Sequence, residues 1–247
     1  MQPTIYEWPR CWRGVTESQF YLAPSNLQSI SPYTGQATPY GPQTQIWTAK
    51  LTSPTMSPGD RRGMPWRQVQ GFVTRLRGIG GMLRIVDYHR QRPAYDQLRA
   101  SPSEEPWSDD TLFTDGHGWS VGYLPPTVAA DAMAREGANS IVVHGLPASL
   151  RSALDAGDLF EVRPGGVHAA HGHLYEVMAR ADTDAAGRVR LYFEPGLRKQ
   201  VAAGDMIVLR EPTSVFRLAT DQEGIVQRSI ASFGDMGMSL TEVLPWQ

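Results

Sequence analysis

The sequence predicts a mainly β, β-rich α+β fold, in which one helix covers a sheet and a small barrel or sandwich follows. Three observations predict it: one strongly periodic helix, short strand-like runs at close spacing, and 24 glycines and 19 prolines scattered without a period. Turn residues spread in this way favour many short strands over a helical or collagen-like chain. The 247 residues suffice for one large domain or two modest ones.

The periodic helix is expected over about 65–77. Pro65 suits the first helical position, where a missing N–H is no loss. Apolar residues then recur at steps of three and four, which draws one stripe: Trp66, Val69, Phe72, Val73 and Leu76. Gly78 is expected to end the helix, and the apolar run 82–86 predicts a strand. We therefore expect this helix to cover a β-sheet and to bury its stripe there.

Strand-like segments account for most of the remaining chain. Residues 43–52 alternate in polarity, and the side with Trp47, Ala49 and Leu51 is expected to face a core. Further strands are predicted over 140–146, 158–162, 173–181, 188–193, 206–210, 215–219, 225–231 and 238–243. Their spacing indicates a small barrel or sandwich in the second half. Short helices are expected over 127–136 and 149–154.

The segment Ser25–Gln45 is polar and rich in proline and glycine. It has little apolar material with which to build a core of its own. Two interpretations stay open at this point. The segment is either a loop without fixed structure, or an extended arm that gains its order on a neighbouring subunit.

Composition argues against several classes of partner. The 23 Lys and Arg are balanced by 25 Asp and Glu for a net charge of −2, without any basic block, so we expect no nucleic-acid recognition. No apolar run approaches the ~20 residues that span a bilayer, so we expect no membrane insertion. No signal-peptide pattern opens the sequence, MQPTIYEWPR, which predicts synthesis and retention in a cytoplasm. The single cysteine, Cys11, excludes an intrachain disulfide.

The patterns H-E-x-x-H and a phosphate-binding glycine loop are missing. The run Gly118-Trp119-Ser120-Val121-Gly122 has the spacing G-x-S-x-G, but no strand is predicted directly before it, as the nucleophile turn of a hydrolase requires. The glycines at 78, 80 and 81 follow a helix rather than a strand, which is the wrong order for a dinucleotide site. We therefore expect no enzyme and no cofactor.

Three weaker clusters leave alternatives open. His168, His171 and His173 lie close enough to hold zinc, although their spacing matches no strong zinc pattern and a polar loop is favoured. A second cluster could bind calcium or act as acid and base, with a polar loop again favoured: Asp109, Asp110, Asp115 and His117. A third cluster could stack on sugars or pack against a neighbouring domain or subunit: Trp107, Phe113, Trp119 and Tyr123.

Several short motifs, in order, resemble one protein family. In the first half they are Ser31-Pro32-Tyr33-Thr34-Gly35, the strand with Trp47, Leu76-Arg77-Gly78 and Asp87. In the second half they are Ala156-Gly157-Asp158, His173-Leu174-Tyr175, Pro195-Gly196-Leu197-Arg198 and Phe216-Arg217-Leu218. Over residues 30–87 and 137–220 the chain is similar to the distal tail proteins of long-tailed, siphovirus-type bacteriophages.

The resemblance implies a structural virion protein at the tail tip, made in the host cytoplasm. Six copies of a β-sandwich or split-barrel domain would form a ring that joins the tail tube to the tail tip or baseplate. Its partners would be its own copies, the tail tube protein, and the tail-tip hub with other baseplate proteins. A second, OB- or galectin-like barrel would be inserted in the ring domain.

The resemblance also implies a division of the chain. The ring domain would comprise residues 1–100 and 221–247, a linker or insertion 101–136, and the barrel 137–220. Assembly contacts are expected at Ser31, Pro32, Tyr33, Trp47, Trp107 and Trp119. Two alternatives stay open: a carbohydrate-binding module that attaches to a host surface, and a hydrolase that uses the three histidines with a metal.

Overall fold

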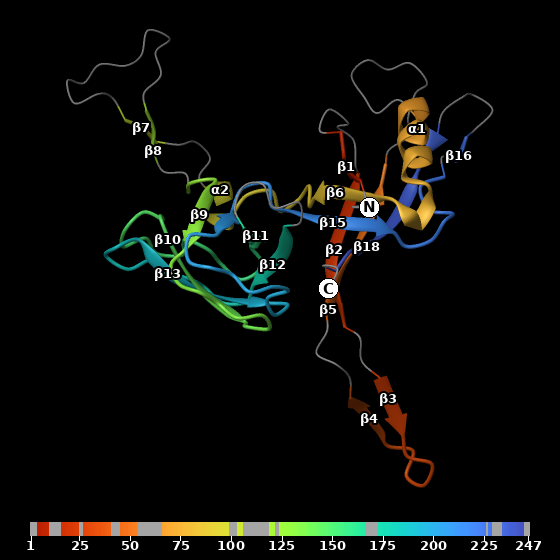
Figure 1. Ribbon diagram of the computed structural model, residues 1–247, viewed down its shortest axis with the longest axis horizontal. Helices are drawn as coiled ribbons and strands as arrows, with labels where there is room; N and C mark the ends of the chain where they lie inside the picture. The colour runs from red at the N-terminus through yellow and green to blue at the C-terminus, as the bar shows by residue number, and fades with distance from the viewer. Residues whose placement is uncertain are drawn as a thin grey trace. The chain divides into compact units, whose positions relative to one another are not determined.

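The chain forms two compact units, one of them inserted in the other (Figure 1). A computed structural model describes residues 4–9, 16–24, 27–40, 45–53, 66–98, 103–105, 119–121, 124–165, 172–225, 227–228 and 234–244. The first unit combines Met1–His89 with Thr213–Gln247, and the second is Arg90–Pro212. The expected divisions at about 100, 136 and 220 thus differ from the divisions of the structure, which fall after His89 and after Pro212.

A six-stranded sheet forms the centre of the first unit, in the order β1, β6, β15, β18, β5, β2. Its strands are β1 (Ile5–Glu7), β2 (Glu17–Pro24), β5 (Gln45–Thr52), β6 (Met82–Val86), β15 (Thr213–Leu218) and β18 (Gly237–Glu242). Strand β1 runs parallel to β6, and every other pair is antiparallel. The two strands that follow the inserted unit therefore lie in the middle of the sheet.

Helix α1 (Trp66–Leu76) buries the predicted stripe over the residues whose side chains are described, and the Trp66 side chain is not among them. Val69, Phe72, Val73 and Leu76 are all buried. The Phe72 ring meets Trp8 edge to face, with centroids 5.5 Å apart. The helix is followed by Arg77 and Gly78, both with positive φ, and by the 3-10 turn η1 (Gly78–Gly80). The prediction of one covering helix on a β-rich fold is thus confirmed, while Pro65 lies outside the described residues.

Strands β2 and β5 form a long antiparallel ribbon, which continues into a hairpin of its own. Pro24 is paired with Gln45 at the end of the ribbon. Residues 25–26 separate β2 from β3 (Leu27–Ile30), and residues 41–44 separate β4 (Ala37–Tyr40) from β5. Strand β3 pairs with β4. These two strands form a separate two-stranded sheet. Part of the expected arm Ser25–Gln45 is therefore a β-hairpin.

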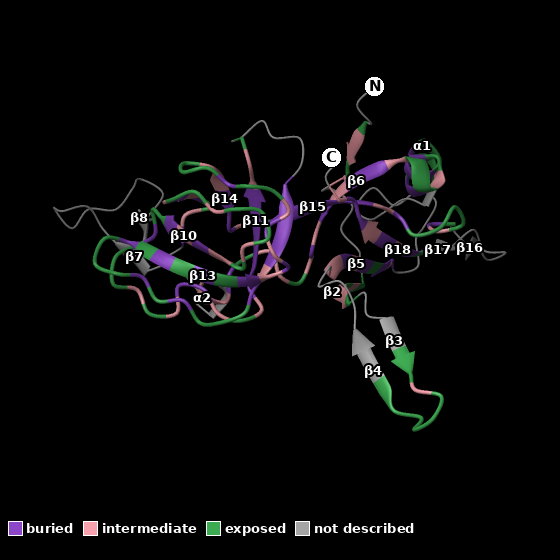
Figure 2. Cartoon of the chain, turned by 60° about the horizontal axis from the view of Figure 1, so that its bottom comes forward, coloured by how far each residue is buried: buried purple, intermediate pink, exposed green. Residues whose placement is uncertain are grey.

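The second unit contains a closed six-stranded barrel, ordered β10, β13, β12, β11, β14, β9. Its strands are β9 (Thr127–Ala130), β10 (Ser140–His144), β11 (Leu159–Arg163), β12 (His173–Val177), β13 (Arg188–Glu194) and β14 (Met206–Val208). In Figure 2, strand β13 alternates between buried and exposed residues. The rings of Phe160, Tyr175 and Phe193 fill the centre, with centroids 5.2 to 5.5 Å apart. The predicted barrel is confirmed, and its interior is occupied by side chains.

Two predictions of local structure and one assignment of a strand to a domain are wrong. Residues 127–130 form strand β9 instead of the start of a helix, because they pair with β10 and β14. Residues 149–154 form turns, with positive φ at Ser149 and Ser152, instead of a helical turn. The strand predicted over 215–219 is β15, which pairs with β6 and β18 and does not belong to the barrel.

Short elements complete the described chain. Helix α2 (Ala94–Leu98) precedes the barrel, and β7 (Ser103–Glu105) pairs with β8 (Trp119–Val121). Near the C-terminal end, β16 (Gln227–Arg228) pairs with β17 (Gly234–Asp235). The strand predicted over 225–231 is therefore shorter than expected in the part that the structure describes.

Candidate assembly surfaces

The tip of the β3–β4 hairpin presents an exposed tyrosine on an ordered turn. Tyr33 is 96% exposed, more than any other large apolar side chain that the structure describes. Beneath it, the Ser31 N–H donates to the Gln36 carbonyl over 3.0 Å, and the Gly35 N–H donates to the Ser31 carbonyl over 2.9 Å. Gly35 has a φ of 67°, which glycine adopts without strain. The turn therefore holds its shape while it leaves Tyr33 in solvent.

The ribbon that carries this tip is uncharged. No Asp, Glu, Lys or Arg occurs between Glu17 and Lys50, although charged residues make up 19% of the whole chain. Ile30, at the end of β3, is exposed as well. A surface without charges loses little hydration energy when another protein covers it, and exposed tyrosines are frequent in protein interfaces. The hairpin tip is thus chemically suited to a contact between proteins.

Three of the six contact residues predicted from the sequence lie together at this tip, namely Ser31, Pro32 and Tyr33. The prediction for Trp47 is wrong as a contact site. Its side chain is 0% exposed, because it projects from an interior strand on the face that packs into the first unit. The inward orientation predicted for Trp47 is confirmed.

The remaining two predicted contact residues cannot be assigned a surface. Trp107 lies outside the described residues, and Trp119 begins strand β8, where the backbone alone is described. Asp109, Asp110, Asp115 and His117 also lie outside the described ranges, as does Cys11.

Strand β2 is an edge that the sequence did not single out. It has eight residues and pairs with β5 on one side, and no other strand of the described chain pairs with it. Tyr21 on this strand is exposed, while Phe20 points inward and meets Phe216 edge to face at 5.6 Å. Its strand character could have been found in the sequence from the β-forming run Phe20-Tyr21-Leu22.

The histidine cluster does not form a metal site in the described part of the chain. His168 and His171 lie outside it, and His173 is 2% exposed in strand β12, opposite Val162 of β11. No group of three His, Cys, Asp or Glu side chains within the described ranges is arranged to hold a metal ion. His173 therefore belongs to the packed wall of the barrel.

Buried acidic groups in the second unit serve its internal structure. Asp158 accepts hydrogen bonds from the backbone N–H groups of Ala94 and Asp155, each over 2.8 Å. Burial raises the pKa of Asp158, and the hydrogen bonds from these two N–H groups oppose that shift. The carboxylate therefore fixes the chain before the barrel onto the barrel itself.

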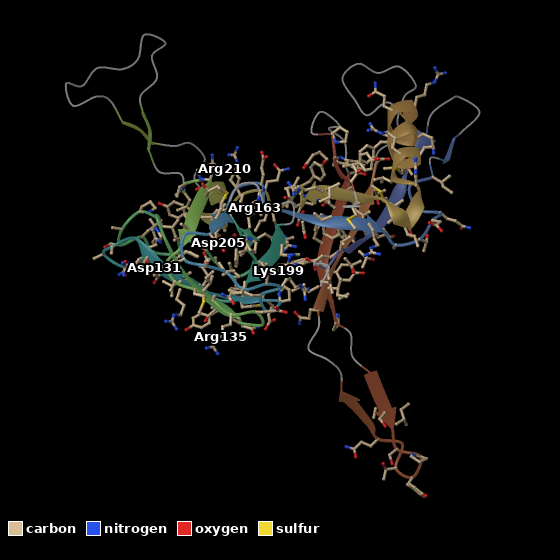
Figure 3. All side chains as sticks on the ribbon, in the orientation of Figure 1. Asp131, Arg135, Arg163, Lys199, Asp205 and Arg210 are labelled. Atoms are coloured by element: carbon tan, nitrogen blue, oxygen red, sulfur yellow. The ribbon has the colours of Figure 1, made fainter. Side chains whose placement is uncertain are left out.

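Two arginines of the barrel are similarly occupied (Figure 3). Arg163 donates to both carboxylate oxygens of the fully buried Glu161, over 2.6 and 3.0 Å. Arg210 donates to Asp96 over 3.3 Å and to the Leu124 carbonyl over 3.3 Å. In each pair the arginine compensates the charge of a buried carboxylate, Glu161 or Asp96.

One shallow hollow of about 470 Å³ lies in the first unit, between β5, β18 and the turn before β16. Lys50, Glu223 and Ile225 are among its lining residues. The Glu223 carboxylate already accepts a hydrogen bond from the Ser239 N–H over 2.8 Å. This hydrogen bond attaches the turn before β16 to strand β18.

No family model matches this chain, and no curated protein matches it in sequence. Within the ranges that the structure describes, no helix is both long enough and apolar enough to cross a membrane.

Proposed function

We propose that this chain is a structural protein of a bacteriophage virion, located at the distal end of a long tail. In this proposal the first unit forms a ring, with six copies, that joins the tail tube to the tail tip or baseplate. The observation that carries the proposal is the uncharged hairpin with Tyr33 fully exposed at its tip.

The hairpin supports the proposal because of its stability. A two-stranded hairpin alone in water is marginally stable, and β3 and β4 pair with no further strand of the described chain. Burial of Tyr33 and Ile30 against a neighbour would supply the free energy that the hairpin lacks, about 1.5–3 kcal/mol for each fully buried large side chain.

The edge strand β2 supports the proposal in a second way. An edge strand directs the N–H and C=O groups of every second residue away from its sheet, which makes it a template for unwanted pairing, and proteins normally cover or charge such an edge. The edge after Glu17 carries no charge. A closed ring, in which each copy contacts the next, covers the edge of every copy and leaves none free.

The proposal is tested by locating the chain in the particle. Antibodies raised against the purified chain are incubated with particles of a virus whose genome encodes the chain. The particles are then viewed by electron microscopy. We expect label at the far end of the tail. Label on the capsid, or purified particles without the chain, would contradict the proposal.

Carbohydrate binding by the barrel stays a prediction from the sequence. Tyr192 is the single exposed aromatic side chain on the described part of the barrel. Stacking on sugars generally uses several aromatic rings in a groove, so no observation here favours this function over the structural one.

A further inference from the structure

The outer side of strand β13 carries arginines and a tyrosine in a row. The strand alternates regularly, with Arg188, Arg190 and Tyr192 outward and the residues between them buried. Residues at every second position of a strand lie on one face, about 7 Å apart. Tyr192 is 51% exposed.

The neighbouring strands widen this row into a surface. On β10, Val142 is opposite Arg190, and His144 is opposite Arg188. On the other side, the Met178 N–H donates to the Tyr192 carbonyl over 2.8 Å, and the Met178 side chain is 44% exposed. We call Met178, His144, Arg188, Arg190 and Tyr192 the β13 face.

The charges of the β13 face are only partly neutralised. Asp131 lies 3.5 Å from the Arg188 guanidinium and 3.6 Å from His144 Nδ1, so one carboxylate serves both groups. Arg190 has no ion pair with any residue that the structure describes. Arginine, tyrosine and methionine are the residue types enriched in protein interfaces. The β13 face is therefore suited to an acidic partner with apolar or aromatic side chains.

The same chain contains a segment of that chemistry. Between Arg99 and Arg135 there is no Lys or Arg, and the stretch 104–115 holds five acidic residues with two large aromatic ones. They are Glu104, Glu105, Asp109, Asp110 and Asp115, with Trp107 and Phe113. Opposite charge favours the encounter of this segment with the β13 face, and the aromatic residues supply apolar contact.

We infer that the β13 face of one copy binds the acidic segment 104–115 of a second copy of this chain. The contact is heterologous, because a face on one copy meets a different surface on the next, and such contacts link copies in series. The interaction goes beyond the proposed tail function. It involves only the second unit, so it is measured separately from ring formation by the hairpin.

Photocrosslinking of the full chain tests this contact directly. One preparation carries p-benzoylphenylalanine in place of Tyr192, and the other is intact chain labelled throughout with heavy nitrogen. The two are mixed, irradiated and digested with trypsin, which releases residues 100–135 as one peptide because it contains no earlier cleavage site. We expect the unlabelled probe peptide to be joined to the heavy 100–135 peptide.

A matched probe and three charge variants test whether the crosslink depends on the β13 face. The same probe in place of Met133, which is exposed but lies outside β10, β12 and β13, should give no crosslink to that peptide. Arg190→Glu in the probe-bearing chain should lower the crosslink yield about tenfold. Asp109→Arg with Asp110→Arg in the heavy chain should restore it, read on the heavy peptides 100–109 and 111–135, because trypsin then also cleaves after positions 109 and 110. Arg135→Glu in the probe-bearing chain is the control, because Arg135 does not belong to the β13 face and lies away from Asp131 (Figure 3). This variant should leave the crosslink yield unchanged.

The outcomes separate clearly. A crosslink to the unlabelled 100–135 peptide alone would place the segment on its own chain and overturn the inference. A crosslink to another segment, no crosslink at all, or a yield that Arg190→Glu does not change would also overturn it. A chain that gives this crosslink but forms no rings in electron microscopy would count against the tail proposal and would leave the inference standing.

Discussion

The Glu242 carboxylate accepts a hydrogen bond from the backbone N–H of Trp47 over 3.2 Å, although 195 residues separate the two in sequence. Glu242 ends β18 and Trp47 lies in the neighbouring strand β5. The other carboxylate oxygen accepts from the Ser214 hydroxyl on β15 over 3.2 Å. One buried side chain thus joins three central strands of the first unit, two of which come after the inserted barrel.

Replacement of Glu242 by leucine should destabilise the first unit strongly. Glu242→Leu leaves the Trp47 N–H and the Ser214 hydroxyl without this acceptor, and each unsatisfied buried group costs about 1–3 kcal/mol. We expect a loss of about 2–4 kcal/mol in the free energy of unfolding, measured by urea titration with tryptophan fluorescence. Glu242→Gln, which keeps one acceptor, should lose about 1–2 kcal/mol. The exposed control Glu17→Leu should change stability by less than about 0.5 kcal/mol, and an equal loss in all three would refute the explanation.

Two glycines of the barrel should respond differently to alanine. Gly187 has a φ of 71°, and an added Cβ would collide with the Leu146 carbonyl oxygen. Gly204 has a φ of 87° with open space around it. Gly204→Ala should therefore lower the free energy of unfolding by about 1–2 kcal/mol for conformation alone, and Gly187→Ala should lower it further because a contact must also shift. Thermal unfolding of both variants would show the order, and the reverse order would contradict it.

The stability of the second unit should depend on pH through Asp158. Burial raises the folded-state pKa of this carboxyl above its ordinary value of 3.8. Its favourable contribution is therefore complete below the unfolded pKa and is lost as the pH rises through the raised folded pKa. As the pH falls from 7 toward 4, the free energy of unfolding of the intact chain should rise relative to that of Asp158→Asn. A difference independent of pH would show that Asp158 does not titrate in this way.

The hairpin should be dispensable for folding and required for assembly. Deletion of residues 25–40 leaves residues 41–44 to connect Pro24 with Gln45, which are already paired, and a four-residue loop closes a hairpin readily. We expect a folded monomer by circular dichroism and light scattering. Tyr33→Ser should weaken assembly with no change in thermal stability. Intact hexamers after the deletion would contradict this role of the hairpin.

The sequence predicts the elements in which apolar residues recur with the period of a helix or a strand. The stripe of α1 and the alternation around Trp47 each specify one inward face, and the structure confirms both. The sequence indicates an arm with contacts at Ser31, Pro32 and Tyr33. It does not predict that strands β3 and β4 pair within this arm.

Other features depend on partners that are distant in sequence. Residues 127–130 follow two prolines and lie among good helix formers, yet pairing with β10 and β14 makes them a strand. Strand β15 directly follows the barrel, but its pairing with β6 places it in the other unit. The β13 face was missed because Arg188, Arg190 and Tyr192 become a surface only when β10 and β12 lie beside them.

The native mass of the purified chain tests the central claim most directly. Light scattering coupled to size exclusion reports the mass of the assembly in solution, and electron microscopy of the same fraction shows its form. We predict a particle of six times the 27.3 kDa chain, seen as a ring with a central hole. A monodisperse monomer at every concentration tested, with or without tail tube protein, would contradict the claim that this chain assembles as a ring.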